Sequence, residues 1–167
     1  MASPAKSPTA QQARFDSPEQ EVFLHLWRTY DCLKAVEEQL FAQHDLSAQQ
    51  YNALRLLQQV APDGMQTMEL GRRLISRAPD TTRMLDRLQK RGLIQRTRRV
   101  ENRRVVEIGL TEQGHALLAS MADAVLEMHR QQLGHLDSAQ RHQLIDLLKS
   151  ARRPHEDASC DWLEDGS

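Results

Sequence analysis

The stretch RAPDTTRMLDRLQKRG, residues 77–92, combines a helical apolar stripe with basic side chains. Three apolar residues recur at the spacing of one helix face: Met84, Leu85 and Leu88. Pro79 suits a first helical turn, and Gly92 suits the left-handed position that ends a helix. The residues left on the outer face are Asp80, Thr81, Thr82, Arg83, Arg87 and Lys90. The sequence therefore predicts a short amphipathic helix with arginines on its outer face.

Positive charge is concentrated around this stretch. Between Arg72 and Arg104 the chain carries twelve Lys or Arg and three acidic residues, a local charge of +9 in a protein of formal net charge −1. The remaining residues therefore carry −10. Because a local excess of positive charge attracts a phosphate backbone, we expect the outer arginines to face nucleic acid.

Length and composition exclude several classes of protein. A chain of 167 residues, 40% of them hydrophobic, is long enough for one domain with its own core. Neither a membrane-length apolar run nor the apolar core of a signal peptide is present, so a cytoplasmic protein without a membrane partner is expected. Cys32 and Cys160 form no CxxC pair, and the histidines lack metal-ligand spacing, so no metal site is expected. Catalytic and cofactor-binding motifs are missing too, which argues against an enzyme and against a cofactor.

Three helices are predicted before the basic one. Capping-box patterns open a long helix at about 17–44 and a second helix at 47–60. The two boxes pair Ser17 with Gln20 and Ser47 with Gln50. Thr67 is expected to cap a short helix that runs through Leu74. The long helix carries an apolar stripe: Phe23, Leu26, Trp27, Tyr30, Leu33, Leu40 and Phe41.

After the basic helix the apolar spacing changes from helical to alternating, which predicts a β-hairpin with an arginine-rich tip at 101–104. One face of its second strand carries Val106, Ile108 and Leu110. Thr111 is expected to cap a long helix with the stripe Leu117, Leu118, Met121, Val125 and Met128. Asp137 opens a last helix that ends near residue 151, with Leu144, Ile145 and Leu148 at helical spacing.

Two short helices followed by a hairpin with a basic tip have the order of a winged helix-turn-helix. The expected fold is therefore mainly α-helical with a small β-hairpin wing. In such a fold the second short helix enters the major groove of double-stranded DNA, because only a helix or a ribbon fits there. The hairpin tip can reach the neighbouring minor groove.

The sequence resembles the MarR (multiple-antibiotic-resistance regulator) family of bacterial winged-helix repressors over about 17–151. The segment LGRRLISRAPDTTRMLDRLQKRGLI (70–94) is similar to the family's helix-turn-helix, with its D-R-L-x-x-R-G-L run at 86–93. The segment NRRVVEIGLTEQG (102–114) is similar to the family's D-x-R-x5-L-T wing and following glycine. Asn102 stands where Asp is usual. An asparagine hydrogen-bonds an arginine without charge assistance, so a less rigid wing tip is expected.

The resemblance implies a transcriptional regulator that binds a pseudo-palindromic operator as a homodimer, a repressor released by a small aromatic or phenolic ligand. The long apolar faces of the first and last helices also favour a dimer over a closed monomer. The expected organisation is a flexible tail at 1–16, a winged-helix regulator domain at 17–152 and an acidic flexible tail at 153–167. The domain contains a DNA-binding lobe at about 47–110 and dimerisation helices at about 17–44 and 111–151.

Candidate DNA contacts come from the basic helix, its flanks and the wing: Arg73, Arg77, Pro79, Asp80, Thr81, Thr82, Arg83, Arg87, Asn102, Arg103 and Arg104. Arg83 and Arg87, with the two threonines, are expected at base edges or nearby phosphates. Arg73 and Arg77 are expected to anchor the DNA backbone, and Arg103 and Arg104 to serve the wing tip. The resemblance also implies a ligand pocket beside the dimerisation helices, with His25, Trp27, Tyr30 and Arg55 as candidates. Core packing for the two aromatic residues, and solvent exposure for His25 and Arg55, are the alternatives.

Two other functions compete with a ligand-released repressor. Redox sensing through Cys32 requires an accessible thiolate of low pKa. Because the only cation beside it in sequence is Lys34, which points elsewhere, a buried structural cysteine is expected instead. A winged-helix protein-interaction module that does not bind DNA should lack the combination of basic helix and basic tip. Duplex binding that weakens steeply with salt separates a DNA-binding protein from such a module.

Overall fold

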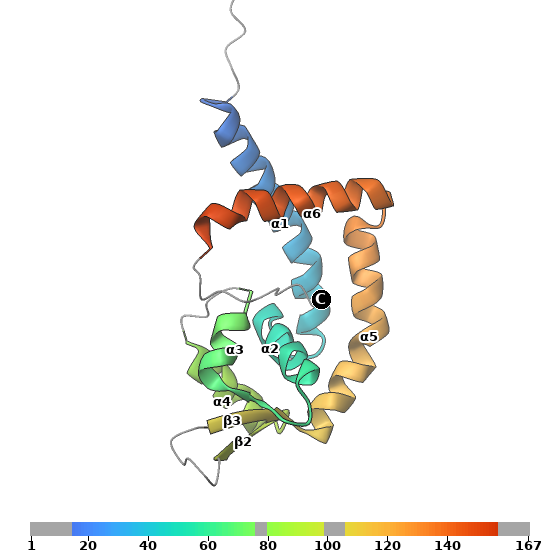
Figure 1. Cartoon of the computed structure of the whole chain (residues 1–167). Helices are drawn as coiled ribbons and strands as arrows, with labels where there is room; N and C mark the ends of the chain where they lie inside the picture. The colour runs from blue at the N-terminus through green and yellow to red at the C-terminus, as the bar shows by residue number, and fades with distance from the viewer. Residues whose placement is uncertain (1–14, 76–79, 99–105, 157–167) are drawn as a thin grey trace, which may run out of the picture. The chain divides into compact units, whose positions relative to one another are not determined.

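The computed structural model describes residues 15–75, 80–98 and 106–156 (Figure 1). The chain divides into two units, Met1–Ala35 and Val36–Ser167. The first holds the N-terminal part of helix α1 (Pro18–Ala42), and the second holds the rest of that helix. The second unit also contains α2 (Ala48–Gln59), β1 (Met65–Gln66), α3 (Thr67–Arg73), α4 (Thr81–Lys90), β2 (Ile94–Arg98), β3 (Val106–Leu110), α5 (Glu112–Leu133), α6 (Ser138–Arg152) and the 3-10 helix η1 (Arg153–His155). The prediction of a mainly helical fold with a small β-hairpin wing is confirmed.

Side-chain caps start four helices of the second unit, α2, α4, α5 and α6. At α2 the Oγ of Ser47 accepts a hydrogen bond from the backbone N–H of Gln50 (3.2 Å), and the Oε1 of Gln50 accepts one from the N–H of Ser47 (2.8 Å). The same reciprocal arrangement links Asp137 and Gln140 at α6. Because a cap satisfies N–H groups that have no partner inside the helix, these starting points were predictable from short sequence patterns.

The start and end of α1 differ from the prediction. Ser17 accepts from the N–H of Gln20 as expected, but the side chain of Gln20 accepts from the N–H of Asp16 rather than that of Ser17. The helix ends at Ala42, two residues before the expected His44. The chain turns there through Asp45, whose φ of 52° lies in the left-handed region.

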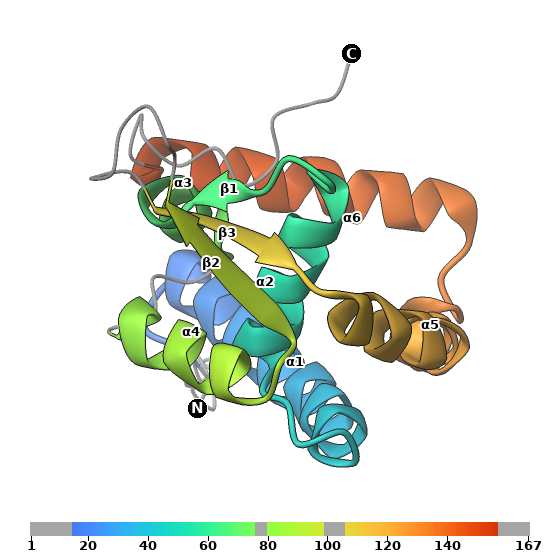
Figure 2. The ribbon, with the colours of Figure 1, turned by 90° about the horizontal axis from the view of Figure 1, so that it is seen from below.

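The sheet has three strands in the order β1-β3-β2, all antiparallel (Figure 2). β2 and β3 form the predicted hairpin, with Ile94 opposite Leu110; its tip lies outside the described residues. On the expected inner face of β3, Ile108 is fully buried, whereas Val106 and Leu110 are half-buried.

β1 was not predicted, because two residues are too few for an alternating pattern. Met65 pairs with Ile108, and Gln66 pairs with Glu107. The extended backbone of Gln66 makes this residue the N-cap of α3. Thr67 is therefore the first residue of the helix, and the prediction that it caps α3 is wrong.

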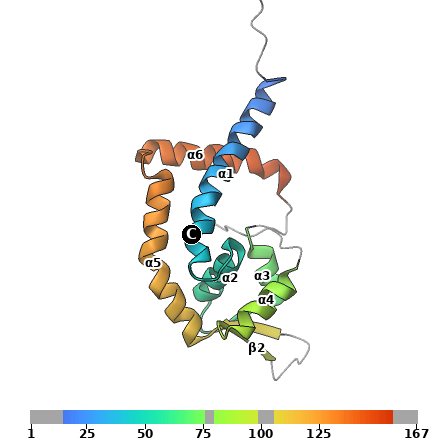
Figure 3. The same cartoon turned by 180° about the vertical axis from the view of Figure 1, so that it is seen from behind.

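The hydrophobic core lies in the second unit, and α2 contacts both α3 and α4 (Figure 3). Fully buried side chains come from α2, α3, α4, the sheet and α5: Leu54, Leu57, Leu70, Leu85, Leu88, Ile94, Ile108 and Met121. Phe41 joins them and stacks on Tyr51, with ring centroids 4.6 Å apart. Burying each such side chain contributes about 1.5–3 kcal/mol, so this core holds the inner face of α4 in place.

Helices α6 and α5 differ from each other in burial. No residue of α6 is buried, and Leu144 and Ile145 of its predicted stripe are exposed. On α5 the predicted stripe is buried except for Leu117, which is half-buried. Among the described residues, no helix combines the length and the apolar character needed to cross a bilayer.

The start of α5 packs tightly against the end of the α4–β2 turn. The hydroxyl of Thr111 donates to the carbonyl of Gly92 (2.6 Å), and its N–H donates to the carbonyl of Leu93 (3.2 Å). A Cβ on Gly114 would lie 2.3 Å from that same Leu93 oxygen. This close approach is the physical reason for a glycine three residues after the cap.

We predict that Gly114→Ala lowers the free energy of unfolding by about 1–3 kcal/mol, because the added methyl group forces α5 away from the sheet. Urea denaturation followed by circular dichroism measures the change. Gly71→Ala is the matched control: no atom lies within 4 Å of its added Cβ, and alanine favours a helix interior, so stability should rise by up to about 1 kcal/mol. Equal stability of the Gly114 variant and the wild type would contradict the packing argument.

Candidate nucleic-acid interface

Helix α4 forms the basic, amphipathic element that the sequence predicts. Its inner face carries the three expected apolar residues, Met84, Leu85 and Leu88, all buried. Asp80 is the N-cap, and its side chain accepts from the N–H of Arg83 (3.0 Å). Gly92, with a φ of 69°, terminates the segment as predicted. The cap and the glycine therefore limit a ten-residue helix whose polar side faces outward.

The outer face of α4 is cationic. Thr82, Arg83, Arg87 and Lys90 are exposed, and Thr81 is half-buried. Arg83 forms an ion pair with its own N-cap, Asp80, at 2.8 Å between Nε and Oδ2, while its side chain stays 80% exposed. Arg87 has no carboxylate partner among the described residues. The guanidinium groups of this face are therefore available to an external acceptor.

Some of the clustered arginines serve the fold instead. Arg91 donates to the carbonyls of His44 (3.0 Å) and Asp45 in the turn that follows α1. Arg96 on β2 pairs with Asp86 on α4 at 2.6 Å. The contacts of Arg91 fasten the end of α4 to the turn after α1, and the ion pair of Arg96 joins β2 to α4. Part of the local positive charge is therefore paired within the protein. The net charge of the segment alone overstates the number of arginines that are available to nucleic acid.

The other predicted contact residues divide into two groups. Arg73 on α3 forms an ion pair with Glu69 at 2.7 Å and keeps about a third of its side chain exposed. The rest lie outside the described residues: Arg77, Pro79, Asn102, Arg103 and Arg104.

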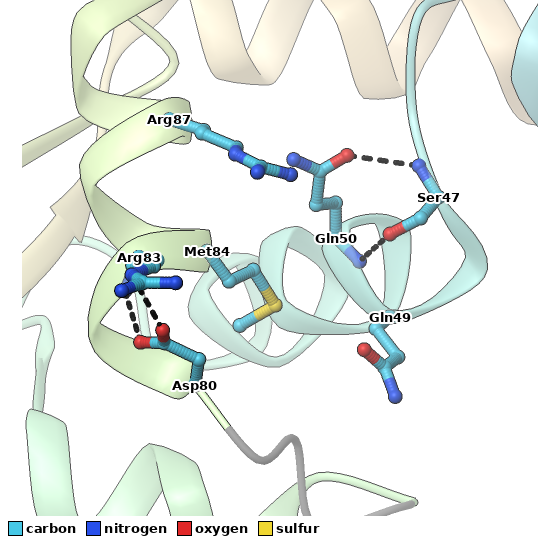
Figure 4. Close-up of a pocket in the computed structure, with 7 residues that line it drawn as sticks. All are labelled: Ser47, Gln49, Gln50, Asp80, Arg83, Met84 and Arg87. Carbon is cyan, nitrogen blue, oxygen red and sulfur yellow. Dashed lines mark hydrogen bonds and ion pairs between the residues drawn. The ribbon is translucent and has the colours of Figure 1, made fainter.

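A hollow of about 280 Å³ lies between the first turn of α2 and α4 (Figure 4). Its lining residues are Ser47, Gln49, Gln50, Asp80, Arg83, Met84 and Arg87. Three of them were predicted as DNA contacts. The sequence predicts Ser47 and Gln50 only as the capping box of a helix. A capping-box pattern does not indicate which other helix packs opposite it.

None of the four candidate pocket residues lines this hollow. His25, Trp27 and Tyr30 are exposed on the part of α1 that belongs to the first unit, so the core-packing alternative for the two aromatic residues is wrong. Arg55 is an exposed residue of α2 whose guanidinium donates to Gln58 (2.6 Å), as the solvent-exposed alternative predicts. Burial raises the pKa of the neighbouring Tyr51, and the positive charge of Arg55 lowers it by a smaller amount.

Cys32 is exposed on α1, so the prediction of a buried structural cysteine is wrong. The apolar stripe on this part of α1 is itself exposed, and a cysteine beside the stripe therefore meets solvent. Within the described ranges, no group of three or more His, Cys, Asp or Glu side chains is arranged to hold a metal ion.

Comparison with known proteins places these features in one family. Residues 46–106 match the MarR family. A MarR transcription factor from Planctomyces limnophilus, known from a crystal structure, is 53% identical, with a TM-score of 0.64 over 82% of this chain and 99% of that chain.

Two further structures share the fold. BpsR of Bordetella bronchiseptica, solved in a study of how 6-hydroxynicotinic acid regulates its DNA binding, has 24% identity and a TM-score of 0.71 over 81% of this chain and 95% of that chain. A MarR family regulator from Streptomyces coelicolor, solved in complex with DNA, has 17% identity and a TM-score of 0.76 over 91% of this chain and 97% of that chain. Together with the identity to the Planctomyces protein over nearly its whole length, the winged-helix architecture and the cationic outer face of α4 establish that the chain belongs to the MarR family of transcriptional regulators.

Proposed function

We propose that the protein is a repressor that binds a pseudo-palindromic operator as a homodimer and is released by a small aromatic or phenolic ligand. The observation that carries DNA binding is α4 itself, a helix with a buried inner face and exposed guanidinium groups outside. A single exposed helix of this size fits the major groove. The regulator from Streptomyces coelicolor with the same fold was solved in complex with DNA, which supports this use of the fold.

Within the interface, Arg83 is the candidate for reading a base. The ion pair with Asp80 limits the positions of its guanidinium, and a pre-positioned guanidinium donates to a guanine edge through two parallel hydrogen bonds. Thr81 and Thr82 are the first two residues of the same helix, and Thr82 is exposed. Arg73 and Arg77 would anchor phosphates, and Arg103 and Arg104 would contact the minor groove from the wing.

Dimerisation is proposed from apolar surface that the chain leaves uncovered. Within the first unit, α1 exposes Val22, Phe23, Leu26, Trp27 and Tyr30. Within the second unit, α6 exposes Leu144, Ile145 and Leu147. Exposed apolar faces of this extent mark interaction surfaces, and a second copy of the chain would bury the same faces on both partners.

Release by a ligand is proposed from the family and from one relative. The DNA binding of BpsR is regulated by 6-hydroxynicotinic acid, a small aromatic acid. His25, Trp27 and Tyr30 lie on the proposed dimer helix, where a bound ligand would change the spacing of the two α4 helices. Two half-sites lie about 34–36 Å apart, so a small change in spacing breaks the register.

We predict that Arg83→Ala weakens operator binding by about 1–3 kcal/mol, or roughly 5- to 150-fold, because a bidentate contact to a base is lost. Fluorescence anisotropy with operator and random duplexes of equal length measures the change. Arg130→Ala, which removes an exposed charge from α5, is the control and should bind both duplexes as the wild type does. An equal loss on random DNA would reassign Arg83 to a phosphate, and no loss would remove it from the interface.

We predict that Trp27→Asp converts the dimer to a monomer, because it places a charge in the middle of the proposed apolar contact. Light scattering after size-exclusion chromatography measures the mass. Met68→Asp introduces the same charge at an exposed apolar residue of α3 and should remain dimeric. A monomeric wild type, or a dimeric Trp27 variant, would argue against this interface.

We predict that 6-hydroxynicotinic acid or a hydroxybenzoic acid dissociates the protein from its operator and raises its Tm, because a ligand stabilises the state it binds. Anisotropy competition and thermal unfolding provide the two measurements. The exposure of Cys32 favours the alternative of a thiol switch. Release by peroxide that Cys32→Ser abolishes, with no response to any aromatic acid, would replace the ligand proposal with that alternative.

A further inference from the structure

The hollow between α2 and α4 is lined by hydrogen-bond donors that have no acceptor among the described residues. Gln50 is only 9% exposed, so its side chain has little freedom. In the capping box its Oε1 is bound to the N–H of Ser47. This bond determines the orientation of the amide, because the Nε2 must then point away from Ser47. Figure 4 shows the Nε2 of Gln50 pointing toward the guanidinium of Arg87. Among the described residues, no hydrogen-bond acceptor lies between the Nε2 of Gln50 and the guanidinium of Arg87.

Asp80 supplies the one carboxylate among the described residues that line the hollow, and this carboxylate is already paired. Asp80 accepts from the N–H of Arg83 through Oδ1 and pairs with the Nε of Arg83 through Oδ2, so both of its oxygens are used. On the opposite side, the first turn of α2 adds the partial positive charge of a helix N-terminus. Met84 supplies an apolar floor. An anion entering the hollow would therefore meet donors on two sides and no free carboxylate.

We propose that this hollow is the seat of one phosphate group of the DNA backbone, with one phosphate oxygen accepting from Arg87 and another from the Nε2 of Gln50. The proposal rests on the proposed DNA binding. It assigns Arg87 to the backbone, leaving Arg83 as the base-reading arginine of α4. Because a phosphate contact sets the register of a protein on the duplex, the seat would position α4 in the groove. The buried Gln50 would hold its donor in place before the DNA arrives.

Gln50→Glu tests the seat without disturbing the helix start. A glutamate at this position also completes a capping box, because its carboxylate can accept from the N–H of Ser47. The substitution replaces the Nε2 donor by an oxygen and places negative charge opposite Arg87. We expect an unchanged Tm and about tenfold or greater weakening of binding on both operator and random duplexes, with a salt slope reduced by about 1.

Gln59→Glu is the matched control, since it adds the same charge at an exposed residue at the far end of the same helix. It should change the affinity by less than about twofold, as expected for a distant surface charge in salt. Wild-type affinity and salt slope in the Gln50 variant would overturn the seat while leaving DNA binding by α4 intact. Failure of the wild type itself to bind any duplex would overturn the proposed function and the seat together.

Backbone substitution locates the phosphate. A neutral methylphosphonate is placed at each backbone position of one operator half-site in turn, and the affinity is measured for both proteins. We expect one position at which the substitution weakens the wild type but does not weaken Gln50→Glu further, because that variant has already lost the contact. Equal effects on the two proteins at every position would overturn the proposal.

Discussion

Burial of one face of α4 is the constraint on which the rest of the molecule depends. A ten-residue helix is only marginally stable alone, so its position must come from packing. Leu85 and Leu88 are fully buried in the core, and Asp80 caps the helix start. With the inner face held in this way, the side chains on the outer face can only point to solvent or to a partner. The same burial that stabilises the helix therefore presents its arginines.

Some arginines of α4 and its flanks are paired within the chain, and others stay exposed to a partner. Arg91 and Arg96 are engaged with the turn after α1 and with Asp86, and they fasten α4 to its neighbours. Arg83 is held by its own helix cap but stays exposed. Arg87 faces the amide of Gln50 across a hollow in which the carboxylate among the described lining residues, that of Asp80, is already paired with Arg83. Groups held in place before binding lose less conformational entropy when DNA arrives, which favours affinity for a correctly placed backbone.

The sequence predicted the elements that depend on neighbours within a few residues. The Ser47–Gln50 box, the Thr111 cap, the stripe of α4 and the left-handed Gly92 all follow from local hydrogen bonding or helical periodicity. It failed where distant segments decide the outcome. Strand β1 exists because Met65 pairs with Ile108, and this pairing also displaces the expected cap of α3. Cys32 is exposed because an apolar stripe in the sequence does not reveal whether the chain's own core covers it.

By itself, then, the sequence determined which segments are helical, which form the hairpin and where most of them begin. It also determined that the helix in the basic segment, α4, presents arginines on its outer face. Only the tertiary structure decided which arginines remain available, since Arg91 finds its acceptors 46 and 47 residues earlier in the chain. It also brought the first turn of α2 against α4, so that a capping glutamine came to lie opposite Arg87. The physical reason is that caps and periodicity act within one or two helical turns. Burial and the pairing of charges depend instead on which distant segments the hydrophobic core brings together.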